Sequence, residues 1–348
     1  MTFSTLRTTG CLDHRAFTLL GALFVFAPAW TPQVSGVNTT LRGVSAVNDR
    51  IAWASGSGGT VLRTEDGGST WKRITVPADT PLDFRDIDAI DGRTAYLLSI
   101  GNGPASRIYK TADAGATWVA QFQNQDPKVF LDAMSFWDAT HGIVVGDSID
   151  GQFCIMTTEN GGKSWTRVPS AALPPALANE GAFAASGTNI AVLGSQEAWI
   201  GTGAAEIARV LHTADRGRTW TIAATPLRSG ASAGIFSIAF RDRQHGIVVG
   251  GDYRRESDAV DNMAVTADGG RTWTLVRGLS GFRSVVAYVP GEQRSLMAVG
   301  PQGSDLSSDD GQSWTPLPGS GYHTLSFSPS GRVAFGAGAR GTVGRLDR

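Results

Sequence analysis

The sequence is poor in cysteine and in charged residues, and it has no long hydrophobic run. Its 348 residues include 2 cysteines, and 18% of the residues are charged. Cys11 precedes a short apolar run, and Cys154 lies in a strand-like stretch. Removal of the N-terminus would leave Cys154 alone, which would exclude an internal disulfide. A lone cysteine in such a stretch is typical of core packing.

An excess of charge of one sign is also missing. The net charge is −1 at pH 7, which gives no electrostatic field suited to nucleic acid or to an anionic membrane surface. No G-x-G-x-x-G stretch stands between a strand and a helix, and no cluster of metal ligands stands out in the sequence. We therefore expect no nucleic-acid partner, no cofactor and no bound metal.

The N-terminus has the pattern of an export signal. Basic residues Arg7 and Arg15 precede apolar residues 16–26, and residues 27–29 read Ala-Pro-Ala, an A-x-A cleavage pattern. The alternative is a membrane anchor, but the apolar run is shorter than the roughly 20 residues that cross a bilayer. Cleavage is therefore the favoured interpretation.

These features predict the domain organisation. We expect residues 1–29 to be a signal peptide and residues 30–348 to form a single domain. The mature protein would be exported, in the periplasm or outside the cell, or in a lumen if the organism is photosynthetic. No integral membrane span is expected in the mature chain, and we expect a monomer.

One eight-residue phrase, here called the box, occurs six times. It has the form Ser/Thr-x-Asp/Asn-x-Gly-x-Ser/Thr-Trp, and its copies are Thr64–Trp71, Thr111–Trp118, Thr158–Trp165, Thr213–Trp220, Thr266–Trp273 and Ser307–Trp314. The Asp or Asn side chain is expected to accept hydrogen bonds from backbone N–H groups two residues on. Glycine would supply the positive φ of the loop, and the tryptophan would start the next strand and bury its ring between repeats.

The spacing of the boxes predicts an all-β fold. Successive box tryptophans are 41 to 55 residues apart, which is the period of a four-stranded propeller blade. Apolar residues alternate with period two between the boxes, as in strands. After the last box the chain supplies only three more strands, whereas residues 30–34 resemble the strand that begins at Trp314. We therefore predict a seven-bladed β-propeller whose last blade is closed by the N-terminal strand, paired beside residues 341–346.

At these boxes the sequence resembles the Asp-box (bacterial neuraminidase repeat) superfamily across the whole mature chain. That superfamily includes sialidases, xyloglucan-degrading enzymes, sortilin-type receptors and the photosystem II stability/assembly factors. The last group is the most similar, because a G-x-x-V-G stretch precedes the box, here as Gly142–Gly146 and Gly246–Gly250. The resemblance implies an exported single propeller that acts in photosynthesis-related assembly, or a bacterial counterpart of it.

Residues that break the repeat are the better functional candidates, because the fold does not require them. In a propeller with this strand order, the face opposite the boxes surrounds the central channel, where ligands normally bind. The residues predicted to bind a ligand or partner there are Arg42, Asp86, Asp132, Glu180, Asp252, Tyr253 and Arg283. Arg85 and His323 lie near the starts of inner strands as well. The alternatives are a solvated channel mouth and internal ion pairing of part of this set.

The predicted function is that of a rigid scaffold without catalytic residues that binds a protein partner, such as a segment of a membrane protein. The alternative is a sialidase-like or polysaccharide glycoside hydrolase. Such an enzyme needs two carboxylates, and Asp86 and Asp132 on adjacent blades could provide them. Tyr288 stands where other repeats have phenylalanine, so we interpret it as a core residue and not as a sialidase nucleophile. The sequence leaves open whether the protein is an enzyme.

Overall fold

The computed structural model describes residues 1–4 and 28–348 of the chain. The predicted signal peptide falls mainly on residues 5–27, which lie outside the described residues, so its cleavage stays a prediction. Within the described part, no helix has both the length and the apolar character needed to cross a bilayer.

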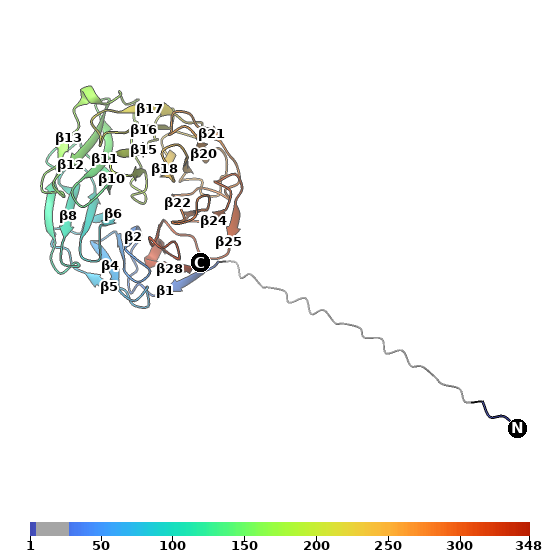
Figure 1. Cartoon of the computed structure of the whole chain (residues 1–348). Coiled ribbons are helices and arrows are strands. Elements are labelled where there is room, and N and C mark those ends of the chain that lie inside the picture. Colours follow the sequence, from blue (N-terminus) through green and yellow to red (C-terminus); the bar gives the residue numbers. More distant parts are fainter. Residues whose placement is uncertain (5–27) are drawn as a thin grey trace.

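Residues 28–348 form seven four-stranded antiparallel sheets, the blades, which follow one another around a ring (Figure 1). Blades 1 to 3 consist of β2 (Leu41–Ala46), β3 (Ala52–Gly56), β4 (Thr60–Thr64) and β5 (Lys72–Ile74); β6 (Asp83–Ala89), β7 (Ala95–Ile100), β8 (Arg107–Thr111) and β9 (Val119–Gln123); and β10 (Leu131–Phe136), β11 (Gly142–Ile149), β12 (Gln152–Thr158) and β13 (Thr166–Arg167). Blades 4 and 5 consist of β14 (Ile190–Leu193), β15 (Glu197–Gly201), β16 (Arg209–Thr213) and β17 (Thr221–Ala224); and β18 (Ala233–Phe240), β19 (Gly246–Asp252), β20 (Met263–Thr266) and β21 (Thr274–Leu275).

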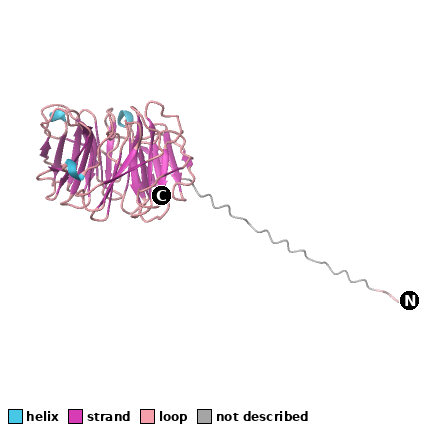
Figure 2. Cartoon of the chain, turned by 90° about the horizontal axis from the view of Figure 1, so that it is seen from above, coloured by secondary structure: helices cyan, strands magenta, loops and turns pink. Residues whose placement is uncertain are grey.

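The last two blades bring the chain back to its start. Blade 6 consists of β22 (Val285–Tyr288), β23 (Leu296–Gly300), β24 (Gly303–Ser307) and β25 (Thr315–Leu317), and blade 7 of β26 (Thr324–Phe327), β27 (Val333–Ala337), β28 (Val343–Asp347) and β1 (Trp30–Gln33). Three short 3-10 helices, η1 (Gly103–Ala105), η2 (Ser170–Ala172) and η3 (Ala339–Gly341), lie in connections. Seen from the side, the ring is a short cylinder whose strands run between two ends formed by loops (Figure 2).

The predicted all-β, seven-bladed propeller is confirmed, including its closure by the N-terminal strand. β1 pairs antiparallel with β28, and Trp30 lies opposite Leu346. The two ends of the chain therefore share one sheet, with the strand order β26-β27-β28-β1. This pairing leaves no gap between the first and last blades, which is how a propeller avoids long exposed strand edges.

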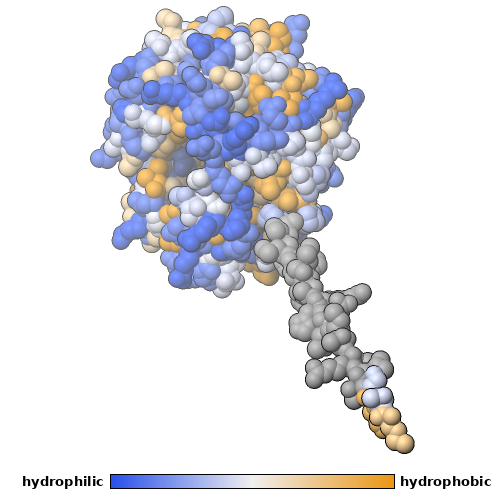
Figure 3. Space-filling view, turned by 45° about the vertical axis from the view of Figure 1, so that its right-hand side comes forward, coloured by the Kyte–Doolittle hydropathy of each residue, from blue (hydrophilic) through white to orange (hydrophobic). Residues whose placement is uncertain are grey.

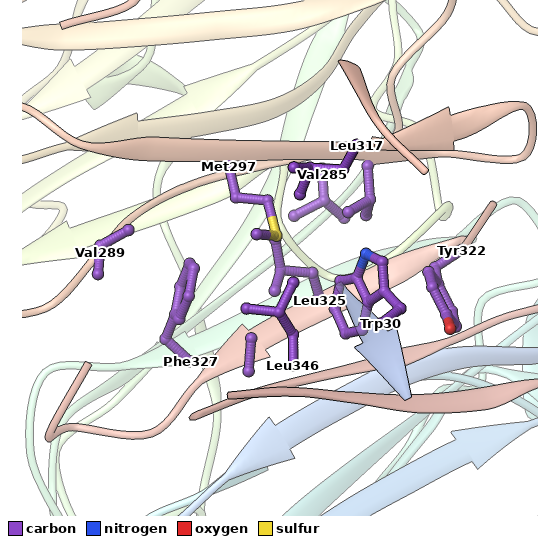
Figure 4. Packing of buried hydrophobic residues seen from close by; sticks show 11 residues of the cluster. Trp30, Val285, Val289, Met297, Leu317, Tyr322, Leu325, Phe327 and Leu346 are labelled. Atoms are coloured by element: carbon purple, nitrogen blue, oxygen red, sulfur yellow. The ribbon is translucent and has the colours of Figure 1, made fainter. Parts of the chain in front are cut away.

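Trp30 has the same role in blade 7 that the box tryptophans have in the other blades. Its side chain is buried and packs with Leu325 and Leu346 of blade 7 and with Leu317 of blade 6 (Figure 4). The indole Nε1–H donates to Ser304 Oγ of blade 6 at 3.0 Å. Trp30 thus fills the seam between blades 6 and 7.

The box is a loop closed by its own side chains. In the first box, Asp66 accepts hydrogen bonds from the backbone N–H of Thr70 at 2.9 Å and from the Thr70 hydroxyl at 2.7 Å. Thr64 Oγ1 accepts from the N–H of Gly68 at 2.8 Å. The predicted distance of two residues was wrong: the donors lie four residues on, because the eight-residue loop is wider than an Asx turn and its chain returns to the carboxylate only at Thr70.

The two hydrogen-bond donors of Thr70 also stabilise the ionised form of the Asp66 carboxylate. Its backbone N–H and its hydroxyl lower the pKa of Asp66 to about 2. The same four-residue contacts recur at Asp113, Asn160, Asp215, Asp268 and Asp309. Each box is therefore a structural loop whose Asp or Asn side chain accepts hydrogen bonds from within the loop.

Box tryptophans fill the seams between neighbouring blades. The Trp118 ring of blade 2 packs edge-on against Trp53 of blade 1, with centroids 6.0 Å apart. The Trp71 ring of blade 1 packs in the same way against Phe335 of blade 7, at 6.1 Å. The core is thus a series of inter-blade clusters, and each blade depends on both of its neighbours.

Replacement of Trp30 tests the closure of the ring. We expect Trp30→Ala to lower the free energy of unfolding by roughly 3 to 5 kcal/mol, because it removes a large buried ring and leaves a cavity in the closing seam. The matched control is Val34→Ala, at a side chain that is 84% exposed, where a change within about 0.5 kcal/mol is expected. Urea denaturation of both variants measures the difference. Equal stabilities would show that the seam does not depend on this residue.

Candidate functional site

The structure has two cavities away from the centre of the ring, of about 580 and 700 Å³, and a third cavity at the centre. This central cavity, here called the mouth cavity, has a volume of about 530 Å³ and lies where the inner strands begin, at the end of the ring opposite the boxes. All seven blades contribute residues to it or to its rim.

Hydrophilic residues cover most of the surface seen in Figure 3, where hydrophobic residues form small separate groups.

A repeated β-bulge supplies side chains to the mouth cavity. The inner strands of blades 1, 2, 3 and 5 each have a register shift close to their first residue. The residues skipped by the four shifts are Arg42, Arg85, Asp132 and Phe236, and all four line the cavity. A bulge can redirect a side chain without interrupting the sheet. The same backbone irregularity therefore presents two arginines, one aspartate and one phenylalanine to the cavity.

The side of the cavity formed by blades 7, 1 and 2 is basic. It contains His323, Arg42 and Arg85. Arg85 is already engaged, because its Nε–H donates to Asp83 at 2.9 Å and its Nη1–H donates to Ala184 O at 3.0 Å. Arg42 Nε and His323 Nδ1 are buried and have no hydrogen-bond partner among the described residues.

Burial sets the protonation states of Arg42 and His323 on the basic side of the cavity. Burial, together with the positive charge of Arg85, lowers the pKa of Arg42 to about 10, so Arg42 remains a cation at neutral pH. Burial, followed by the charge of Arg42, lowers the pKa of His323 to about 4, so His323 is neutral. Arg42 is thus a charged group at the cavity without an ion-pair partner in the described part of the chain.

Blade 3 supplies two carboxyl groups, Asp132 and Asp147. Asp132 is 1% exposed. Burial, followed by the negative charge of Asp147, raises the pKa of Asp132 well above its usual range. Burial raises the pKa of Asp147 to about 6. Burial thus favours the protonated form of Asp132, whereas Asp147, with a pKa of about 6, is mainly ionised at neutral pH and gives this side of the cavity a negative charge.

The opposite side, formed by blades 5 and 6 and by the loop that enters blade 4, is aromatic. The rings of Phe183 and Phe236 are stacked, with centroids 4.0 Å apart and planes at 9°. Phe282 meets Phe236 edge-on at 4.7 Å. The Tyr253 ring lies edge-on to both stacked rings, 6.3 Å from Phe183 and 6.1 Å from Phe236, and Tyr253 is 42% exposed.

Residues 181–189, here called the plug, cross the central channel below the cavity. Ala184 O accepts from Arg85 of blade 2, Thr188 Oγ1 donates to Ser237 Oγ of blade 5 at 2.8 Å, and Ser186 Oγ donates to the carbonyl of Ser284 in blade 6 at 3.0 Å. A segment that reaches inner strands of blades 2, 5 and 6 has to cross the ring. The plug therefore forms the floor of the cavity.

Asp86 lies under the plug and does not line the cavity. Its carboxylate accepts from the N–H of Met134 at 2.8 Å. Gly187 covers it so closely that an added Cβ would lie 2.1 Å from Asp86 Oδ1, and Gly187 also has a φ of +75°. Burial, opposed in part by the Met134 N–H, raises the pKa of Asp86 to about 8.

Three further predicted residues have internal partners. Glu180 forms an ion pair with Arg209 and accepts from Thr202 Oγ1 at 2.6 Å. Arg283 is 1% exposed, and its Nε–H donates to Asp305 at 2.6 Å. Asp252 accepts from Ser232 Oγ at 2.8 Å and lies 3.9 Å from Arg228. Of the seven predicted residues, the structure brings Arg42, Asp132 and Tyr253 together at the mouth cavity.

The sequence analysis missed the aromatic side of the cavity. Phe236 occupies the bulge position that Arg42 and Asp132 occupy in their blades, and alignment of the inner strands could have identified it. Its apolar side chain favoured a core interpretation instead. No repeat predicts Phe183, because it belongs to the plug. Tyr288, predicted to be a core residue, packs at the seam of blades 5 and 6 and donates to Asp310 at 2.8 Å.

Comparison with known proteins supports the resemblance seen in the boxes. The sequence model of the family described as "Photosynthesis system II assembly factor YCF48" matches residues 31–128, from β1 to β9. No curated protein sequence matches the chain. The fold is similar to that of YCF48 from Cyanidioschyzon merolae, with a TM-score of 0.66 and 18% identity over 92% of this chain and 99% of that one.

Two further solved structures have similar folds. "YCF48 bound to D1 peptide" matches with a TM-score of 0.65 and 18% identity over 92% of this chain and 97% of that one. The GH74 xyloglucanase from Xanthomonas campestris matches with a TM-score of 0.61 and 16% identity over 91% of this chain but only 53% of its own. At these identities the likeness establishes the fold alone. The chain is an all-β propeller that resembles the photosystem II assembly factors.

The burial of Asp86 predicts a pH dependence of stability. Folding raises the pKa of Asp86 from about 3.8 to about 8, so the folded protein binds this proton more tightly than the unfolded chain. The free energy of unfolding therefore falls as the pH rises from about 4 to about 8. The loss is up to about 1.4 kcal/mol per pH unit. Asp86→Asn cannot ionise but can still accept from the Met134 N–H. We expect its free energy of unfolding, from urea denaturation at pH 5 to 8, to fall less steeply than that of the wild type. Parallel curves would contradict this assignment.

Proposed function

We propose that this protein is an exported, non-catalytic scaffold that binds a segment of a protein partner at the mouth cavity. Its role would be that of a photosystem II assembly factor or of a bacterial counterpart. The observation that carries the proposal is the set of four bulges that direct basic, acidic and aromatic side chains into one cavity on a scaffold that is otherwise repeated. Export is supported by the N-terminal sequence pattern.

A protein segment fits the cavity in size and in chemistry. A volume of about 530 Å³ lies in the range of small-ligand sites, so it admits a few side chains and not a folded domain. Exposed Tyr253 and partly buried Arg42 are residue types that often dominate binding energy at protein interfaces. The likeness to a YCF48 structure with a bound D1 peptide supports a segment of a membrane protein as the partner.

The hydrolase alternative gains no support from the two carboxyl groups named for it. Asp132 lines the cavity, but Asp86 lies beneath Gly187 of the plug. A glycosidase needs both carboxyl groups to reach the same bond of the substrate, and the plug separates these two. The cavity therefore supports binding better than hydrolysis.

Site-specific photo-crosslinking tests the proposed binding face. We expect p-benzoylphenylalanine in place of Tyr253 to crosslink a defined protein partner in the envelope or lumen of the native cell, and mass spectrometry to locate the crosslink in one segment of that partner. The matched control is the same substitution at Val119, a 59% exposed residue of β9. Identical crosslinks at both positions, or none at Tyr253, would overturn the assignment of this face.

A further inference from the structure

We infer that the mouth cavity recognises two consecutive side chains of an extended partner segment, one acidic and one aromatic. This inference rests on the proposed function and specifies what the cavity selects in the partner. It follows from the separation of the lining into a basic side and an aromatic side. Both sides border a single volume of about 530 Å³.

Arg42 supplies the acidic preference. A guanidinium that is largely removed from water needs an anion to compensate it, and the surrounding chain does not provide one at hydrogen-bond distance. Two carboxylates lie near Arg42, but neither forms a hydrogen bond with it: Asp83 Oδ2 accepts from Arg85 at 2.9 Å, and Glu256 accepts from Gln302 Nε2 at 2.8 Å. Arg42 is therefore the cation of the cavity that remains available to a ligand carboxylate.

Two carboxyl groups of blade 3, Asp132 and Asp147, also line the cavity, and Asp132 Oδ2 has no hydrogen-bond partner among the described residues. The backbone N–H groups of Ala184 and Ala182 donate to Asp132 and Asp147, respectively. The plug thus uses these carboxyl groups for its own main chain. A basic side chain in the cavity would be repelled by Arg42 and attracted by Asp147, whereas an acidic side chain could pair with Arg42 directly.

The aromatic preference comes from the opposite side. The stacked Phe183 and Phe236 rings present a fixed apolar wall, and the exposed ring of Tyr253 stands beside them. Ala182, Ala184 and Ala185 also line the cavity, and their small side chains leave room in front of this wall. An incoming aromatic ring can pack edge-on or offset against these rings, with a gain beyond that of area burial alone.

The positions of the two sides favour consecutive residues. Arg42 comes from blade 1 and Phe236 from blade 5, which lie across the ring from each other (Figure 1). Successive side chains of an extended segment point in opposite directions. A segment that enters the mouth can therefore direct one side chain to Arg42 and the next to the aromatic wall.

Binding of short peptides tests the inference. The probes are capped, fluorescein-labelled octapeptides of glycine and serine with one variable central pair: glutamate-phenylalanine, glutamine-phenylalanine, glutamate-alanine or lysine-phenylalanine. The proteins are the wild type, Arg42→Gln, Tyr253→Ala and a matched control, Arg50→Gln. Arg50 is exposed and lies at the box end of blade 1, where its carbonyl accepts from Gly67 N–H at 2.9 Å. Fluorescence anisotropy gives each Kd, and thermal melting confirms folding.

The expected result is a specific coupling between Arg42 and the carboxylate. Arg42→Gln should weaken binding of the glutamate-phenylalanine peptide about tenfold, as expected for loss of a charge-assisted hydrogen bond, and should leave the glutamine-phenylalanine peptide within about twofold. Tyr253→Ala should weaken the phenylalanine peptides and leave the alanine peptide unchanged. Arg50→Gln should change none of them. Equal binding of the glutamate and glutamine peptides, or tighter binding of the lysine peptide, would overturn the inference.

The experiment also separates failure of the inference from failure of the proposed function. Crosslinking of a partner at Tyr253 without binding of any peptide of the panel would overturn the inference and leave the proposed function standing. Peptide binding with the expected couplings, but with identical crosslinks at Tyr253 and Val119, would overturn the proposed function instead.

Discussion

The antiparallel pairing of β1 with β28 is the constraint on which the rest of the structure depends. A propeller blade buries its faces only against its two neighbours, so an open ring would leave two blades half exposed. The register that places Trp30 opposite Leu346 also places the indole against blade 6. Next to this seam, Ser326 Oγ of blade 7 accepts from the Ala46 N–H of blade 1 at 3.1 Å. The cavity exists because these contacts keep all seven inner strands facing one axis.

One end of the ring has nearly the same structure in each repeat, whereas the other end carries different side chains. At the box end, each box forms almost the same hydrogen bonds, and Asp66 and its equivalents accept them from donors in their own loops. At the other end the bulges repeat the backbone and change the side chain, from Arg42 to Asp132 to Phe236. The repeated backbone holds positions constant, so the chemistry of the mouth can change without a change of fold.

This division explains how much could be predicted from the sequence. The number of blades and the closing strand follow from the spacing of the boxes and from the likeness of residues 30–34 to the strand after the last box. The position of Arg42, Asp132 and Tyr253 at the mouth could be predicted because they break the repeat near the channel. The internal roles of Glu180 and Arg283 could not, because their partners Arg209 and Asp305 meet them only through the sheet register. The path of the plug across the ring is likewise a tertiary property, which no local pattern encodes.

The plug determines which groups of the mouth remain available for recognition. Its backbone carbonyl at Ala184 takes a donor of Arg85, and its N–H groups at Ala182 and Ala184 face Asp147 and Asp132. These contacts involve main-chain atoms of the plug, so they do not depend on the side chains of Ala182 and Ala184. It leaves the Arg42 guanidinium without a partner within the described part of the chain, and through Phe183 it supplies one ring of the aromatic wall. The segment that closes the channel therefore also helps to place one cation and one aromatic surface at its mouth.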